Sequence, residues 1–203
     1  MSKGSLRDAD RSREAILDAA EEQFSQFGYE RVSLGAIAER AGVSRGLPSY
    51  FFVDKENLYR TVMERAATRN RRAVLDVVRS VEGNEPRQII STLIDRYIDY
   101  LAENPRVVRL LQWEALETAT RSSAGTSGVP RRVFLEASKL VSERMRTNSI
   151  GGIDVDDLLL SIVSLCLYPF QAMPRKDTKQ KSFVQKHKRN VSAIVLRAIG
   201  GKT

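Results

Sequence analysis

The feature that most constrains this chain is a helical hydrophobic period that runs through almost all of its 203 residues. Apolar side chains recur every three or four positions, as they do along one face of an α-helix, and no segment shows a convincing strand-like alternation. A glycine or proline stands at most of the breaks between these segments. The sequence therefore predicts an all-α protein of nine helices.

The local helix signals are clearest in the first third of the chain. Gly28 and Gly42 follow apolar segments where a helix would end, while Ser33 and Asp54 precede segments where a helix would begin. The inward face of the first helix is predicted to carry Ile16, Leu17, Ala20, Phe24 and Phe27.

Composition favours a soluble protein. Apolar residues make up 42% and charged residues 29%, and no uninterrupted apolar run reaches the roughly 18 residues of a membrane span. The first residues lack the apolar core of a signal peptide. A single cysteine, Cys166, suits a reducing compartment. We expect a cytoplasmic protein without membrane contact. With one histidine and one cysteine we expect no structural metal site, and nothing indicates a cofactor.

The net charge of +8 is concentrated at the C-terminus. Residues 174–203 hold 9 basic and 1 acidic residues, whereas residues 1–72 hold 13 and 11. We interpret the C-terminal excess as the solvated face of the last helix. It is weak support for a polyanion partner.

Residues 38–44 have the pattern of a tight turn between two crossing helices. Ala38 supplies the small residue that close helix contact needs, and Gly42 supplies a residue tolerant of positive φ. Val43 then fills the junction and Ser44 can cap the next helix.

With this setting, residues 13–60 resemble the N-terminal domain of the TetR family of bacterial transcriptional regulators. The resemblance is carried by "AILDAAEEQFSQFGYERVSLGAIAERAGVSRG" and "YFFVDKENLY". It implies the TetR-like fold, with a flexible arm at 1–10, a helix-turn-helix domain at 11–53 and a ligand-sensing and dimerisation domain at 54–203.

The resemblance also implies residue roles on double-stranded DNA. Ser33 and Lys55, which open two helices, should touch phosphates, and the Tyr50 hydroxyl should reach the backbone. Arg45 is the candidate for a guanine contact, because its planar fork matches O6 and N7; a phosphate contact is the alternative. The segment that enters the major groove comprises Ser44, Arg45, Gly46, Leu47 and Ser49.

Pro48 lies within this reading segment, and proline removes a backbone donor. With Ser44 as cap, only the bond to the Ser44 carbonyl would be lost. We expect the helix either to begin with a tight 3₁₀ turn or to begin at Pro48 itself.

The segment 158–170 is apolar almost all round, which is typical of a helix buried in a large core or at an oligomer interface. We favour the interface, formed across a two-fold axis with the last helix. The predicted homodimer contacts are Leu159, Ile162, Val163, Cys166, Phe170, Val191, Ile194 and Val195.

A sensor pocket for a small molecule is predicted among aromatic and soft side chains on the central helices. These are Tyr97, Tyr100, Trp113, Phe134, Met145 and Tyr168. The alternative is that each belongs to an ordinary core, and nothing in them specifies a ligand chemistry.

Two other functions are alternatives to DNA binding controlled by a small molecule. An all-α enzyme has no support in a nucleotide, hydrolase or zinc-protease motif, and we expect none: His187 lies in a basic stretch and Cys166 in an apolar one. A regulator controlled by a protein partner is the second alternative. The sequence favours a homodimeric DNA-binding repressor released from a pseudo-palindromic operator by a small molecule.

Overall fold

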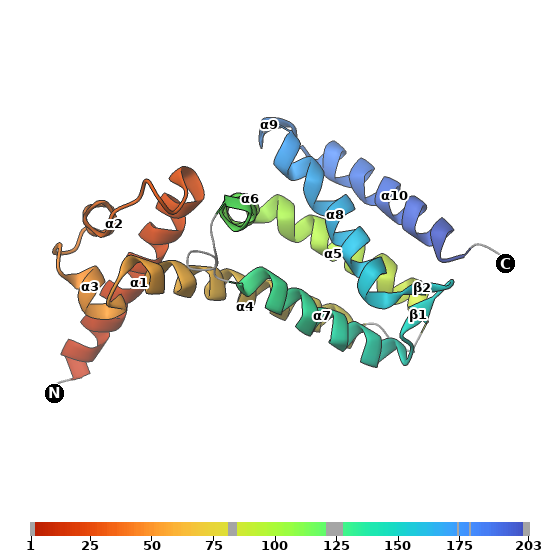
Figure 1. The fold of residues 1–203 in the computed structure, drawn as a ribbon, viewed down its shortest axis with the longest axis horizontal. Coiled ribbons are helices and arrows are strands. Elements are labelled where there is room, and N and C mark those ends of the chain that lie inside the picture. The colour runs from red at the N-terminus through yellow and green to blue at the C-terminus, as the bar shows by residue number, and fades with distance from the viewer. Residues whose placement is uncertain (1–2, 81–84, 121–127, 174, 179, 201–203) are drawn as a thin grey trace. The chain divides into compact units, whose positions relative to one another are not determined.

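The computed structural model describes residues 3–80, 85–120, 128–173, 175–178 and 180–200, and nearly all of them are helical (Figure 1). This confirms the all-α prediction. The helices are α1 (Lys3–Phe27), α2 (Leu34–Ala41), α3 (Leu47–Phe52), α4 (Lys55–Ser80), α5 (Pro86–Glu103), α6 (Pro105–Thr120), α7 (Val129–Met145), α8 (Val155–Ala172), α9 (Arg175–Thr178) and α10 (Lys181–Ala198).

Two elements in the described residues were not expected. A short hairpin pairs β1 (Ser149–Ile150) with β2 (Ile153–Asp154). Its two-residue turn needs positive φ at both positions, and Gly151 and Gly152 supply φ values of 59° and 79°. The one-turn α9 is an additional short helix, so the described residues hold ten helices rather than the predicted nine.

The N-terminal segment differs from its prediction as well. Residues 1–10 were expected to form a flexible arm, but α1 begins at Lys3 and continues without a break to Phe27. The physical reason is that residues 3–10 contain no proline, and their Leu, Arg and Ala are good helix formers that simply extend the following helix.

The chain divides into two compact units. Unit 1 comprises Met1–Ala66 with Arg109–Pro130, and unit 2 comprises Ala67–Val108 with Arg131–Thr203. Helices α4 and α6 therefore contribute residues to both units. The helix-turn-helix segment lies entirely in unit 1.

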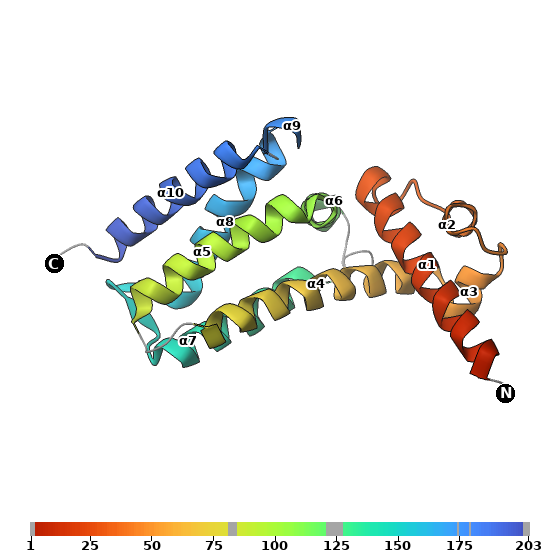
Figure 2. The same cartoon turned by 180° about the vertical axis from the view of Figure 1, so that it is seen from behind.

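In unit 1, α1 packs against α2 and α3 through the predicted face (Figure 2). Ile16, Leu17, Ala20 and Phe24 are fully buried, whereas Phe27, at the last turn, is 40% exposed, contrary to expectation. Arg65 of α4 ties this helix to α1, because its guanidinium donates to Asp18 at 2.8 Å and to Glu21 at 2.7 Å.

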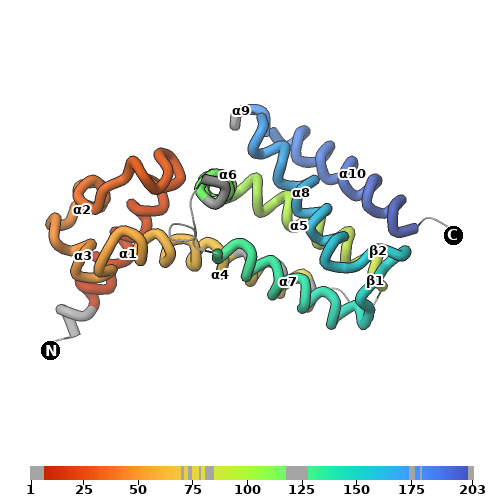
Figure 3. The backbone as a smooth tube through the Cα atoms, in the orientation of Figure 1, coloured from red at the N-terminus to blue at the C-terminus, as the bar shows by residue number. Residues whose placement is uncertain are grey.

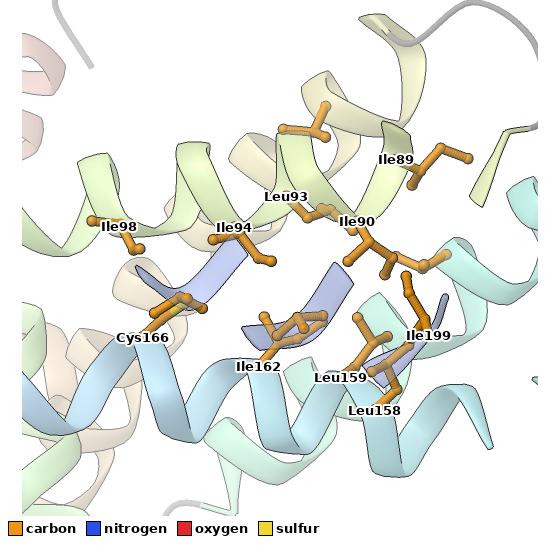
Figure 4. Packing of buried hydrophobic residues seen from close by; sticks show 14 of the residues in the cluster. Ile89, Ile90, Leu93, Ile94, Ile98, Leu158, Leu159, Ile162, Cys166 and Ile199 are labelled. Atoms are coloured by element: carbon orange, nitrogen blue, oxygen red, sulfur yellow. The ribbon is translucent and has the colours of Figure 1, made fainter. Parts of the chain in front are cut away.

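In unit 2, α5, α8 and α10 form the core (Figures 3 and 4). Ile90, Ile94 and Ile98 of α5 face Ile162 and Cys166 of α8. By length and composition α8 is the one described helix that could cross a membrane. Its buried side chains pack on α5 instead, and the core helix of a soluble protein passes the same test.

Candidate functional site

Helix α2 is held between two caps that the sequence predicted. The Ser33 hydroxyl oxygen accepts a hydrogen bond from the Ala36 amide at 3.1 Å. At the other end, Gly42 has a φ of 67°, and its amide bonds back to the carbonyls of Ala38 and Glu39. These two caps set the length of α2 and turn the chain toward α3.

Helix α3 begins at Leu47, with Gly46 as its N-cap and Pro48 as its second residue. Ser44 is not the cap: its carbonyl accepts from the Leu47 amide at 3.1 Å, an i to i+3 bond that closes a tight turn before the helix. The expected tight turn is present, and the helix starts one residue before Pro48 rather than at it. A proline so close to the start removes no helical bond, because the first amides have no partner within the helix.

A strained residue links α3 to α4. Val53 has φ 66° and ψ −61°, a region that a β-branched side chain rarely adopts. The Asp54 amide bonds to the Phe52 carbonyl at 2.7 Å across it, which makes this a three-residue γ-turn. Asp54 then caps α4, as predicted, by accepting from the Asn57 amide at 2.7 Å.

Most of the predicted DNA-contacting residues are exposed on unit 1. Tyr50 is 78% exposed, and Ser33, Ser44, Arg45, Gly46 and Ser49 are exposed too, while Leu47 is half-buried. Within the described part of the chain, the Arg45 guanidinium has no hydrogen bond or ion pair. Arg40 differs, because Glu22 binds it in a bidentate pair at 2.8 and 3.0 Å. Arg45 is thus available to an external acceptor, and Arg40 is committed to α1.

Lys55 is held more tightly than the sequence suggested. Its ammonium donates to the Tyr29 carbonyl oxygen at 3.1 Å and lies 4.3 Å from the centre of the Tyr29 ring. An ammonium has three donors, so donors remain for another acceptor. The structure shows the anchor at Tyr29, and the phosphate contact stays a prediction.

Sequence reasoning missed the support beneath this surface, which comes from the second half of α6. The Tyr59 hydroxyl donates to Glu114 at 2.9 Å, and the Tyr29 amide donates to Glu117 at 3.1 Å. The Trp113 indole donates to the Ser25 carbonyl at 3.3 Å. A pair of glutamates and a tryptophan on one helix was the available signal, but their partners lie far away in sequence.

Gly28 explains why α6 can approach so closely. A Cβ atom on Gly28 would lie 2.9 Å from Cε3 of Trp113, and the residue has a φ of 76°. Glycine is thus required both by the backbone conformation and by the tryptophan ring. Trp113 therefore packs within unit 1, and its role in a ligand pocket stays a prediction.

The other pocket predictions fall into two groups. Tyr168 is 69% exposed, because it lies on the outer side of α8, so it does not line an interior pocket. Tyr97, Tyr100 and Phe134 are half-buried against the core of unit 2, and Met145 is buried within it. A polar surface hollow lies elsewhere in unit 2, at the end of α7, where Lys139, Ser142, Glu143, Arg146, Thr147 and Asn148 line it.

The predicted dimer contacts differ in how far they are buried within a single chain. Five of them, Leu159, Ile162, Cys166, Val191 and Val195, are at most 8% exposed and belong to the core of unit 2. Side chains packed against their own chain are not available to a partner. Val163 and Phe170 are half-buried, and Ile194 is 56% exposed. The large apolar side chains that α8 exposes are instead Leu160, Leu165 and Tyr168.

Cys166 and His187, the two residues considered for catalysis, pack within unit 2. Burial, together with the charge of Asp95, raises the pKa of the Cys166 thiol to about 12, so the nucleophilic thiolate is not formed near neutral pH. His187 is half-buried rather than solvated, because it stacks on Phe183 and donates from Nε2 to the Cys166 carbonyl at 3.1 Å.

Two known protein families match separate parts of this chain. Residues 16–62 match the family described as "Bacterial regulatory proteins, tetR family". Residues 86–195, more than half of the chain, match the family described as "Tetracyclin repressor-like, C-terminal domain".

One curated relative matches nearly the whole length of the chain, and another matches about half of it. The HTH-type transcriptional regulator RutR of Escherichia coli K12 is 26% identical over 198 residues, covering 92% of this chain and 90% of RutR. The HTH-type transcriptional repressor SCO4008 of Streptomyces coelicolor is 30% identical over 114 residues, 56% of this chain and 55% of the repressor.

Solved structures share the fold. A TetR family transcription regulator from Marinobacter aquaeolei VT8 superposes with a TM-score of 0.73 at 20% identity, covering 96% of this chain and 98% of that one. The fatty acid degradation regulator FadR from Bacillus halodurans gives 0.67 at 17% identity, over 94% and 100%. Helix-turn-helix geometry, family matches and fold together lead to one conclusion: the chain belongs to the TetR family of bacterial transcriptional regulators.

Proposed function

We propose that this chain is a homodimeric, sequence-specific DNA-binding repressor of the cytoplasm that a small molecule releases from its operator. The observation that carries the proposal is the exposed Arg45 guanidinium just before α3, which has no partner within the described part of the chain. Exposed Ser49 and Tyr50 follow it on α3. Cationic and hydroxyl donors gathered at a helix-turn-helix suit the acceptor-rich edges and phosphates of DNA.

Each interface residue has a role in this proposal. Arg45 donates to O6 and N7 of a guanine in the major groove, with Ser44, Gly46, Leu47 and Ser49 beside it. Ser33 keeps its hydroxyl proton free to donate to a phosphate while its oxygen caps α2. Tyr50 and Lys55 complete the phosphate contacts, and the anchoring of Lys55 to Tyr29 reduces the rotamer freedom that DNA binding would otherwise cost.

The homodimer would form through the outer side of α8 together with α10. Leu160 and Tyr168 lie two four-residue steps apart on α8, at 53% and 69% exposure, with the small Ser164 between them. Apolar side chains exposed at this spacing form a stripe that a second copy can cover. Ile194 of α10 remains from the sequence-based contact set as an exposed member.

The dimer is tested by charge substitution on this stripe. Leu160→Glu combined with Ile194→Glu should convert the dimer to a monomer in sedimentation velocity. Leu135→Glu is the control, since Leu135 is 43% exposed on α7 of the same unit. A double variant that still sediments as a dimer, or a control that dissociates equally, would count against this interface.

The small molecule would act through α6. Its second half is part of unit 1, where Trp113, Glu114 and Glu117 form hydrogen bonds, whereas its first residues belong to unit 2. A ligand that favours a different position of α6 would shift these contacts and, through Tyr29, the anchor of Lys55. DNA and ligand would then oppose one another reciprocally. Half-buried Tyr97, Tyr100 and Phe134, with buried Met145, are the remaining candidates for the ligand site.

Selection from a random DNA pool with the purified full chain tests the function. The expected result is a two-fold-symmetric motif whose half-sites are centred about one helical turn apart, bound at least about 10³-fold more tightly than a scrambled duplex. Failure to enrich any motif would contradict the proposal.

A further inference from the structure

The helix α1 continues well beyond the part of it that packs in unit 1. Among its residues from Arg7 onward, the first buried side chain is Ile16, yet the helix begins at Lys3. Between residues 7 and 11, all side chains are exposed except Ala9, which is half-buried. At 1.5 Å per residue, Arg7 lies about 14 Å along the axis from Ile16. The described side chains of this N-terminal extension, residues 7–11, therefore contribute little to the core.

The extension leaves unit 1 beside α3. The Arg13 guanidinium lies 5.2 Å from the centre of the Phe52 ring, and Phe52 is the last residue of α3. In Figures 1 and 2 the N-terminal turns of α1 run past α3 and end beyond it. The extension therefore begins next to the C-terminal end of α3.

Two arginines form a narrow stripe on the extension. Arg7 and Arg11 are four residues apart, so their side chains lie about 40° apart around the helix and roughly 6 Å apart along it. Both are exposed, and neither has a hydrogen bond or ion pair within the described residues. Asp10 and Asp8 lie about 60° and 100° away from Arg7, on opposite sides of it.

We propose that Arg7 and Arg11 bind phosphates of the DNA backbone next to the half-site that α3 reads. This inference rests on the proposed DNA-binding function and extends its interface to a second element. The two guanidiniums would add affinity without reading bases, since phosphate contacts carry no direct sequence information. In a dimer the two extensions would supply four such contacts.

The test measures affinity against salt concentration. Each phosphate contact contributes about 0.9 to the slope of log affinity against log salt, so Arg7→Ala with Arg11→Ala should flatten the slope by about 3.6 for a dimer. Between 50 and 200 mM salt this is roughly a 150-fold smaller loss of affinity. The probe is the duplex enriched by selection, with a scrambled duplex of equal length beside it. Alanine sustains helices at least as well as arginine, so circular dichroism should show unchanged helicity.

Two further variants make the result specific. Arg72→Ala with Lys139→Ala removes the same charge from exposed positions of unit 2 and should leave the slope within about one unit of the wild type. Arg7→Lys with Arg11→Lys should keep the wild-type slope. An unchanged slope in the alanine variant, or an equal change in the unit 2 control, would overturn the contact of α1. A wild-type chain that does not distinguish the two duplexes would instead overturn the proposed function.

Discussion

The Tyr59 hydroxyl of α4 donates a 2.9 Å hydrogen bond to Oε2 of Glu114 in α6, and the two residues are only 2% and 5% exposed. Burial, and then the charge of Glu114, raise the pKa of Tyr59 far above its ordinary value, so the phenol remains a donor. This bond joins the helix that opens at the proposed DNA surface to the helix proposed to carry the ligand signal.

Tyr59→Phe should lower the free energy of unfolding by about 1.5–3 kcal/mol, because a buried carboxylate loses a donor. Tyr97→Phe is the matched control: its hydroxyl has no hydrogen bond among the described residues, so its loss should cost less than about 1 kcal/mol. Urea unfolding measures both values. Equal losses would show that the Tyr59–Glu114 bond contributes little.

Glu117 should make stability depend on pH. Burial raises its pKa in the folded chain, although the Tyr29 amide bond and Lys55 oppose the shift. A carboxyl with a raised folded pKa favours folding below its unfolded pKa, and this contribution is lost as the pH rises through the folded pKa. Glu117→Gln, which keeps an acceptor for Tyr29, should therefore stabilise the chain at pH 7.5, with a smaller gain at pH 4.5. A gain independent of pH, measured by urea unfolding, would contradict this assignment.

The contact between Gly28 and Trp113 can be separated from backbone strain by comparing two glycines. Gly42 has a φ of 67° with nothing within 4 Å of an added Cβ, whereas an added Cβ on Gly28 would meet Trp113. Gly42→Ala should cost about 1–2 kcal/mol from the left-handed conformation alone. Gly28→Ala should cost about 1–3 kcal/mol more, because the added methyl overpacks the ring. Equal thermal shifts for the two variants would mean that the ring moves away freely.

Local signals in the sequence were sufficient to predict the helix ends of the helix-turn-helix. Ser33, Gly42 and Asp54 act on amides and carbonyls within a few residues of themselves, so their residue types predict the helix ends directly. The start of α3 was harder to predict, because Ser44 is a good cap by type but Pro48 moved the first turn.

Long-range packing could not be predicted in the same way. Segment 158–170 is apolar on almost all sides of the helix. Its sequence pattern therefore does not distinguish the side that faces α5 from the side that is exposed. This is why Leu159 and Cys166 were assigned to a partner surface and Leu160 was not. The packing of Trp113 could not be predicted because its contacts, Ser25 and Gly28, lie in a different part of the chain.

Pro48 should shape DNA reading without being needed for folding. It is the second residue of α3, where no helical hydrogen bond is lost, so Pro48→Leu and Pro48→Ala should both remain folded dimers. Each substitution removes the fixed φ angle of proline from the backbone between Arg45 and Ser49. The DNA half-site that the variant prefers should therefore change. Motif selection with each variant measures this, and unfolding of both variants would contradict the assigned role.

The central claim is that the segment around α3 reads DNA sequence through Arg45, and motif selection with Arg45→Ala beside the wild type tests it most directly. The account predicts that both proteins enrich a two-fold motif with the same half-site spacing, and that the variant alone loses preference for one guanine per half-site, at a cost of about 1–3 kcal/mol. Identical motifs, with affinity reduced equally on every sequence, would show that Arg45 binds only phosphate and would contradict the claim.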